Sequence, residues 1–219
     1  MEKVRNDLNK AIKGLGENNG LSMINDSVVL EAIKMLKQDK SDPFTDMTTN
    51  CLKEGTGLLV ASITQLFQAC AVHGYLPGEL LIAKIIPLVK DPNGAVNSSE
   101  NYRSICLSSI FLKIWDNIML ILFGDKLESV EMQFGFQKLA GTEMCTWALI
   151  ESINFYTARG DRAYVCFMDC SKAFDKVNHG ELFEKLIETK INPLFLRLLL
   201  YAYRHQKAKV SWEGIESES

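Results

Sequence analysis

The stretch FMDCSKAFDKVNH, residues 167–179, decides how this sequence is interpreted. Residues 164–168, YVCFM, are apolar and predict a strand, and Asp169 follows directly at its expected end. A carboxylate at the end of a strand suits a hard metal ion such as Mg²⁺, which prefers oxygen ligands and keeps several waters. An aspartate that only forms a turn fits the spacing equally well, so the residues alone leave both interpretations open.

A second informative segment lies upstream, at residues 84–120, KIIPLVKDPNGAVNSSENYRSICLSSIFLKIWDNIML. The isoleucine-rich run 80–89 predicts a buried strand, and Pro87 places the end of that strand at a sheet edge. A turn-rich connector follows, and SICL, residues 104–107, predicts the returning strand. The segment therefore predicts a β-hairpin with a long tip.

Apolar spacing and capping residues predict helices over most of the remaining chain. Ser27 is the expected N-cap of the first helix, Ser108 or Ser109 is that of the third, and Asn192 followed by Pro193 is expected to start the last. Gly74 and Gly160 are expected to end two others, and the tail VSWEGIESES suggests a strand that breaks off into polar residues. Met119, Trp115 and Trp147 are expected in the core. Many helices and few strands, without regular alternation, predict an α+β fold. The predicted helices span 27–37, 58–73, 109–126, 142–159, 178–190 and 193–204.

Composition limits the possible functions. The chain has 219 residues, 47% hydrophobic and 23% charged, with a net charge of −3, so any nucleic-acid contact must come from a local basic patch. Six cysteines without a CxxC pair argue against a zinc site and favour reduced thiols in an intracellular protein. The most apolar stretch, 110–124, is interrupted by Lys113 and Asp116, so no membrane association is expected.

The segment 167–179 closely resembles the first palm motif of reverse transcriptases in non-LTR (LINE-type, jockey-like) retrotransposons, written F-x-D-x-S-K-A-F-D-x-V-x-H. Residues 84–120 resemble the fingers block of that family, and QFGFQKLAGTEMCTWAL, residues 133–149, resembles the block that follows. The resemblance covers about residues 25–212. The residues in register with the palm motif are Phe167, Asp169, Ser171, Lys172, Ala173, Phe174, Asp175, Val177 and His179.

The resemblance implies a partial right-hand polymerase with fingers and an unfinished antiparallel palm sheet. It divides the chain into a helical segment, 1–78, the fingers, 79–160, and an incomplete palm, 161–219. It implies an RNA template, a DNA primer and deoxynucleoside triphosphates as partners, and Mg²⁺ as cofactor. The expected location is the nucleus, the cytoplasm or both.

The resemblance also assigns roles to single residues. Asp169 is the expected catalytic residue and metal ligand, assisted by the main-chain carbonyl of Cys170. Phe174 is the expected steric gate that selects deoxynucleotides by clashing with a 2′-hydroxyl; a core phenylalanine is the alternative. Lys90 and Arg103, on the two arms of the fingers hairpin, are expected to hold the triphosphate, and solvated surface charges are the alternative.

A third group of residues is expected close to the template or the nucleotide base. It comprises Gln133, Gly135 and Phe136, although packing explains Phe136 equally well. Asp175 is expected to hold the turn of the motif rather than a metal, and Lys172 either touches backbone phosphate or is solvated.

The sequence departs from the family pattern in one important respect. Two-metal phosphoryl transfer needs several carboxylates around two ions about 3.5–4 Å apart. The family supplies some of them from a later Asp-Asp hairpin, and no Asp-Asp pair occurs in this chain. We therefore expect this polypeptide alone to lack polymerase activity. A non-catalytic remnant that binds nucleic acid or another protein is the alternative hypothesis.

Overall fold

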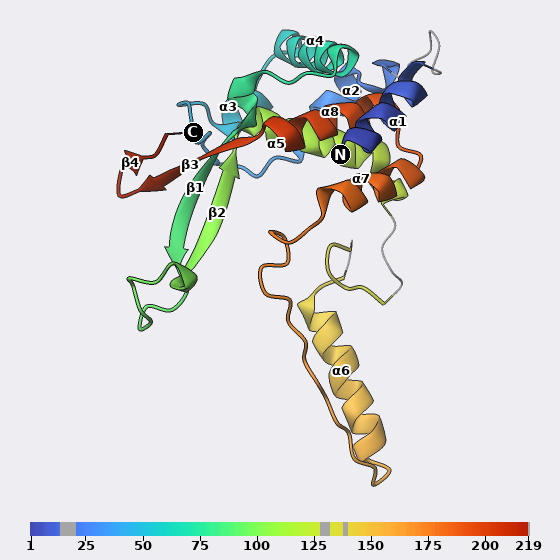
Figure 1. Ribbon diagram of the computed structural model, residues 1–219, viewed down its shortest axis with the longest axis vertical. Helices are drawn as coiled ribbons and strands as arrows, with labels where there is room; N and C mark the ends of the chain where they lie inside the picture. Colours follow the sequence, from blue (N-terminus) through green and yellow to red (C-terminus); the bar gives the residue numbers. More distant parts are fainter. Residues whose placement is uncertain (14–20, 128–131, 138–139, 219) are drawn as a thin grey trace. The chain divides into compact units, whose positions relative to one another are not determined.

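The computed structural model describes residues 1–13, 21–127, 132–137 and 140–218 (Figure 1). These residues form two compact units. Unit 1 comprises Met1–Lys126 together with His179–Ser219, and unit 2 comprises Leu127–Asn178.

Unit 1 combines a group of packed helices with a small sheet that projects from one side of it (Figure 1). Short 3₁₀ turns link several of these elements, at Leu21–Met23, Gly78–Leu81, Ser99–Asn101 and Gly124–Lys126. The α-helices are α1 (Glu2–Lys13), α2 (Asp26–Lys34), α3 (Thr49–Lys53), α4 (Gly57–His73), α5 (Ile110–Phe123), α7 (His179–Glu188) and α8 (Pro193–His205).

An aromatic cluster from three helices lies at the centre of this group. Trp115 of α5 stacks on Phe195 of α8 with ring centroids 5.9 Å apart, and Phe67 of α4 lies 5.5 Å from Trp115. Phe123 meets Phe195 edge-on at 5.0 Å. All four rings are at most 1% exposed, and burial of such large apolar groups is a main source of folding free energy. The cluster therefore joins α8 to helices that precede it by many residues in the sequence.

The sheet of unit 1 has the strand order β2-β1-β3-β4. The strands β1 (Ile82–Val89) and β2 (Tyr102–Ser108) form the predicted antiparallel hairpin. The strand β3 (Lys207–Trp212) pairs with β1 in parallel, from Ile82 to Ile85 only, and β4 (Ile215–Glu216) pairs with β3. Pro87 thus lies beyond the β3 pairing, at the edge position that was predicted for it.

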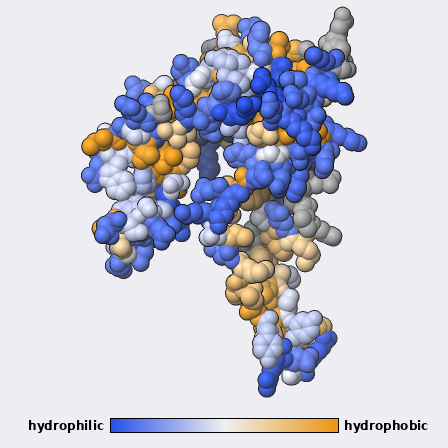
Figure 2. Space-filling model, in the orientation of Figure 1, coloured by the Kyte–Doolittle hydropathy of each residue, from blue (hydrophilic) through white to orange (hydrophobic). Residues whose placement is uncertain are grey.

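Unit 2 contains a single described helix, α6 (Thr142–Thr157), followed by an extended segment that returns along it (Figure 1). Gly160 has a φ of 81°, a left-handed conformation that glycine adopts without strain, so it ends the helical region as predicted. No residue of α6 is buried. Figure 2 shows apolar side chains at the surface of this helix. The Trp147 side chain is 67% exposed. The prediction that Trp147 lies in the core is wrong, whereas Trp115 is buried as predicted.

The α+β class is confirmed, and most helices lie close to their predicted positions. The predicted N-cap Ser27 is wrong, because the side chain of Asn25 accepts the hydrogen bond from the Val28 N–H and the helix begins at Asp26. Ser109 caps α5, and Asn192 caps α8 ahead of Pro193, as expected. Gly74, with φ 64°, ends α4.

The predicted strand at 164–168 is not formed. These residues are extended and exposed, and within the described parts of the chain no strand pairs with them. A strand needs a neighbour for its backbone hydrogen bonds, and an apolar run supplies only the side chains for burial. The prediction of a strand is therefore wrong, although the apolar run on which it was based is present in the sequence.

The interpretation of the tail as a strand that breaks off is also wrong. Residues 207–216 form a hairpin in which Trp212 pairs with Ile215 across the turn Glu213–Gly214. Both turn residues have positive φ, 49° and 82°, which matches a two-residue hairpin turn. The three-part division into 1–78, 79–160 and 161–219 stays a prediction, since the two compact units follow spatial packing rather than function.

Candidate functional site

The β1–β2 hairpin presents the two predicted triphosphate ligands differently. The Lys90 N–H donates to the Asn101 carbonyl at 2.7 Å, and the Lys90 ammonium donates to the Glu100 carbonyl at 2.8 Å. Arg103 lies opposite Leu88 in the register, is exposed, and forms no salt bridge with any described residue. Arg103 is thus available to an anion, whereas Lys90 also holds the tip of the hairpin.

The tip of the hairpin is closed by side-chain hydrogen bonds. The Asn101 amide donates to the Asp91 carbonyl at 2.9 Å, and its oxygen accepts from the Asp91 N–H at 3.0 Å. A Cβ on Gly94 would approach the Asn101 amide to 2.8 Å, so glycine is needed for this close contact. These contacts hold Asp91 against Asn101 and so fix the backbone next to Lys90.

The motif that carries Asp169 forms an exposed loop in unit 2. Asp169 and Cys170 are both exposed and lie outside any helix or strand. The turn that follows is closed by hydrogen bonds from the Lys176 N–H to the Lys172 carbonyl at 3.2 Å and from the Lys176 ammonium to the Ser171 hydroxyl at 3.2 Å. Lys172 has a φ of 54°, the left-handed conformation. These hydrogen bonds are formed by Ser171, Lys172 and Lys176. Among the hydrogen bonds described for this turn, none involves the Asp175 side chain.

Phe174 projects from the same turn and is 79% exposed. The alternative that it is a core phenylalanine is therefore wrong in this structure. An exposed ring on the loop that also holds the carboxylate of Asp169 is compatible with a ring that borders a ligand. The sequence brings Asp169, Cys170 and Phe174 into one loop, and the structure keeps them there.

The third predicted group lies elsewhere in unit 2, in a short turn. The Gln133 amide donates to the Gly135 carbonyl at 2.8 Å. Phe136 has a φ of 61° and is 94% exposed, so packing does not account for it. These residues and the Asp169 loop belong to unit 2, whereas Lys90 and Arg103 belong to unit 1. The structure thus groups the predicted residues into two sets, one in each unit.

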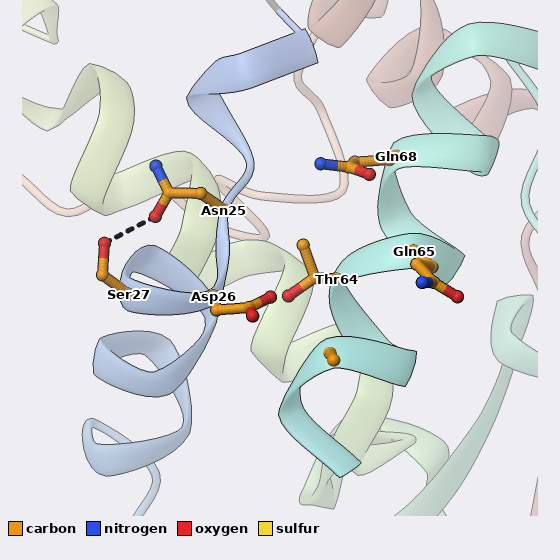
Figure 3. Close-up of a pocket in the computed structure, with 7 residues that line it drawn as sticks. Asn25, Asp26, Ser27, Thr64, Gln65 and Gln68 are labelled. Carbon is orange, nitrogen blue, oxygen red and sulfur yellow. Dashed lines mark hydrogen bonds between the residues drawn. The ribbon is translucent and has the colours of Figure 1, made fainter. Parts of the chain in front are cut away.

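Two pockets are lined by side chains other than these predicted residues. A polar pocket of about 520 Å³ lies between the start of α2 and α4, where Asp26 is the one carboxylate and the Ser27 hydroxyl donates to Asn25 (Figure 3). A second, of about 440 Å³, lies between α6 and residues 162–166 and is lined mainly by apolar side chains such as Leu149, Ile153 and Tyr156. Neither contains a group of side chains suited to phosphoryl transfer.

An ion pair that the sequence analysis did not single out joins the hairpin to β4. The Lys84 ammonium lies 2.5 Å from the Glu216 carboxylate, and this hydrogen bond and charge hold the pKa of Glu216 below its ordinary value. The pair depends on the parallel alignment of β1 with β3, which no local sequence pattern indicates. It fastens the β3–β4 hairpin beside the β1–β2 hairpin.

The donor set of the Asp169 loop can be compared with the needs of a divalent ion. Asp169 and the Cys170 carbonyl offer oxygen ligands in a solvent-accessible place, which fits one hydrated Mg²⁺ that also binds a substrate phosphate. Over residues 1–13, 21–127, 132–137 and 140–218, no three His, Cys, Asp or Glu side chains form a possible metal group.

Comparison with known families agrees with this combination of a fingers-like hairpin and an aspartate loop. The profile of the family described as reverse transcriptase (RNA-dependent DNA polymerase) matches residues 89–217, which include Lys90, Arg103 and Asp169. This match covers more than half of the chain, so the chain belongs to the reverse transcriptase family.

Similar curated proteins come from mobile elements, in agreement with the predicted resemblance to reverse transcriptases of non-LTR retrotransposons. They include the 115 kDa protein of the type-1 retrotransposable element R1DM of Drosophila melanogaster, 29% identical over 58% of this chain, and the RNA-directed DNA polymerase from transposon BS of the same species, 26% identical over 72%. The RNA-directed DNA polymerase from mobile element jockey of Drosophila funebris is 25% identical over 88%. The chain spans only 12%, 18% and 22% of these three proteins.

No helix among the described residues is both long and apolar enough to cross a membrane.

Proposed function

We propose that this chain supplies the fingers and the first palm segment of the nucleotide-binding site of an RNA-directed DNA polymerase. The observation that carries the proposal is the family match over residues 89–217, which contains both the strand β2 with Arg103 and the loop with Asp169. RNA template, DNA primer and deoxynucleoside triphosphate are the proposed ligands. Such copying takes place in the nucleus, the cytoplasm or both.

The fingers hairpin would bind the triphosphate. Arg103 is exposed and unpaired among the described side chains, and its planar guanidinium matches two phosphate oxygens at once. Lys90 contributes a positive charge near the tip, where its ammonium now donates to a carbonyl oxygen. Arg103 is therefore proposed as the main phosphate ligand, and Lys90 as a residue that can exchange its carbonyl partner for phosphate.

The aspartate loop would provide the metal ligands and the selection of sugar. Asp169 and the Cys170 carbonyl would hold Mg²⁺, which when bound neutralises charge on the phosphates. Phe174 would border the sugar of the incoming nucleotide, and its exposure leaves the ring free to do so. Gln133, Gly135 and Phe136 would contact the template or the base.

We further propose that the 219-residue polypeptide does not polymerise DNA by itself. Two ions about 3.5–4 Å apart require more carboxylates than this loop provides. The lack of any three-membered group of acidic, His or Cys side chains among the described residues supports this proposal. The same observation favours the second candidate function, a non-catalytic remnant that still binds nucleic acid or a protein partner.

Primer extension on an RNA template, with Mg²⁺ and deoxynucleoside triphosphates, tests the proposal. The wild-type chain is expected to give no product above that of a reaction without protein. Product that disappears in Asp169→Ala would contradict the proposed inactivity and support the metal role of Asp169. Product that persists unchanged in Asp169→Ala would contradict both statements. Asp161→Ala, an exposed residue of the same unit, is the matched control.

A further inference from the structure

A run of positive charge without acidic residues lies near the end of the chain. Residues 189–212 contain no Asp or Glu and include Lys190, Arg197, Arg204, Lys207 and Lys209, although the whole chain carries a net charge of −3. The run covers α8 and β3, which adjoin each other in unit 1. Because the chain as a whole is acidic, any contact with nucleic acid must come from a locally positive surface, and this run can supply one.

Several of these cations already have partners within the protein. The Arg197 guanidinium donates to the carbonyls of Ala71 and Val72, at 3.1 and 2.7 Å, and thereby caps α4. Lys209 lies opposite Lys84 in the β1–β3 register, close to Glu216. Partial neutralisation by that carboxylate weakens the attraction of this part of the sheet for an anion.

Arg204 and Lys207 differ from these residues. Both are exposed, and neither forms a salt bridge with any residue that the structure describes. Arg204 lies in the last turn of α8, where a positive charge also stabilises the helix end. Lys207 is the first residue of β3, outside the helix, so helix stabilisation does not explain its position.

An aromatic ring lies between these two cations in the sequence, since His205 follows Arg204 and precedes Lys207 by two residues. The His205 ring stacks on Tyr201 with centroids 4.0 Å apart and an angle of 18° between the planes, and its Nδ1 lies 2.8 Å from the Tyr201 carbonyl. Tyr75 meets Tyr201 edge-on at 5.4 Å and is 50% exposed. Flat rings interleaved with exposed cations are the combination that binds single-stranded nucleic acid, by base stacking and phosphate contact.

We propose that the end of α8 and the start of β3 form a binding surface for single-stranded nucleic acid, separate from the residues of the candidate polymerase site. Arg204 and Lys207 contact consecutive phosphates, and the outer face of His205, supported by Tyr201, stacks with a base. A single strand is favoured over a duplex because bases in a duplex are already stacked on one another. The surface uses neither Asp169 nor Arg103, so it can exist whether or not the polymerase assignment holds.

The test is fluorescence anisotropy of a labelled single-stranded RNA, titrated with the 219-residue chain at several salt concentrations. Replacing both cations, Arg204→Gln with Lys207→Gln, is expected to lower the affinity about tenfold at low salt and the slope of log K against log salt by roughly 1.4, about 0.7 for each lost phosphate contact. Lys34→Gln with Lys37→Gln, on the exposed side of α2 and just beyond it, is the matched control and should leave both quantities unchanged.

The stacking contact is tested by two further variants. His205→Ala is expected to lower the affinity severalfold without altering the salt slope, and His205→Phe is expected to restore it. An equal loss in the control pair, equal binding of a duplex of the same sequence, or equal competition by poly-glutamate would each overturn the proposal. Failure here leaves primer extension unaffected, so the two proposals are tested separately.

Discussion

At the residue scale, Arg103 is the side chain on which the proposed nucleotide binding depends most directly. Arg103→Gln keeps a polar side chain but removes the charged fork, so the affinity for a deoxynucleoside triphosphate is expected to fall about tenfold, as for loss of a charge-assisted hydrogen bond. Binding of a fluorescent nucleotide measures this. Lys37→Gln, an exposed position, should have no effect, and an equal fall in that control would show that only net charge matters.

Gly74 is a second position where one residue has a clear physical requirement. Its φ of 64° favours glycine, and a Cβ there would approach the Arg197 guanidinium to 2.3 Å. Gly74→Ala is expected to destabilise the protein by about 1–3 kcal/mol. Urea denaturation measures the change, with Gly57→Ala as the control because nothing lies within 4 Å of that position. Equal midpoints for Gly74→Ala and wild type would contradict this account of the α4 end.

At the element scale, α5 carries an unusual carboxyl group. The Asp116 side chain is exposed at its surface, yet the protein packed around it removes enough water to raise its pKa to about 6 from 3.8. The folded state then favours the protonated form, so this group stabilises the fold fully below about pH 4, and that contribution is lost as the pH rises through 6.

Asp116→Asn removes the charged form and is therefore expected to stabilise the protein near neutral pH. The gain is about 1 kcal/mol or less, since solvent screens a partly exposed group. Denaturation midpoints at about pH 4 and pH 7 measure it, and the gain should vanish at the lower pH. Asp46→Asn, in an exposed loop, controls for loss of one negative charge. A gain that is equal at both pH values would argue against burial as its cause.

The elements also show where sequence analysis succeeded. Helices with a clear cap and a strong apolar face were predicted well, as Ser109 before α5 and Asn192 before Pro193 illustrate. The pairing of Lys207 with Ile82 was not predicted, because parallel alignment between distant segments leaves no local pattern. The segment 164–168 was predicted as a strand on side-chain grounds alone, and strands require partners. In the candidate site, it was predictable that Asp169, Cys170 and Phe174 share one loop. The hydrogen bond from the Lys90 ammonium to the Glu100 carbonyl was not predictable.

At the scale of the whole molecule, the two units differ in how much apolar surface they bury. Six residues of α5 are buried in unit 1, whereas none of α6 is buried in unit 2. Local stability follows buried contacts, so backbone amides of α6 are expected to exchange with deuterium about a hundredfold faster than those of α5. Hydrogen exchange followed by mass spectrometry measures both helices in one sample. Equal protection would show that α6 is covered in solution, by a second copy or by a part of its own chain.

Across the molecule as a whole, the central claim is that the loop at Asp169 is the metal-binding loop of a reverse transcriptase. Titration with Mn²⁺, a paramagnetic substitute for Mg²⁺, followed through the amide NMR signals of the 219-residue chain, tests this claim most directly. We predict selective broadening at Asp169 and Cys170 that is lost in Asp169→Asn and kept in Asp161→Asn. Broadening that persists in Asp169→Asn, or that is lost equally in Asp161→Asn, would contradict the assignment.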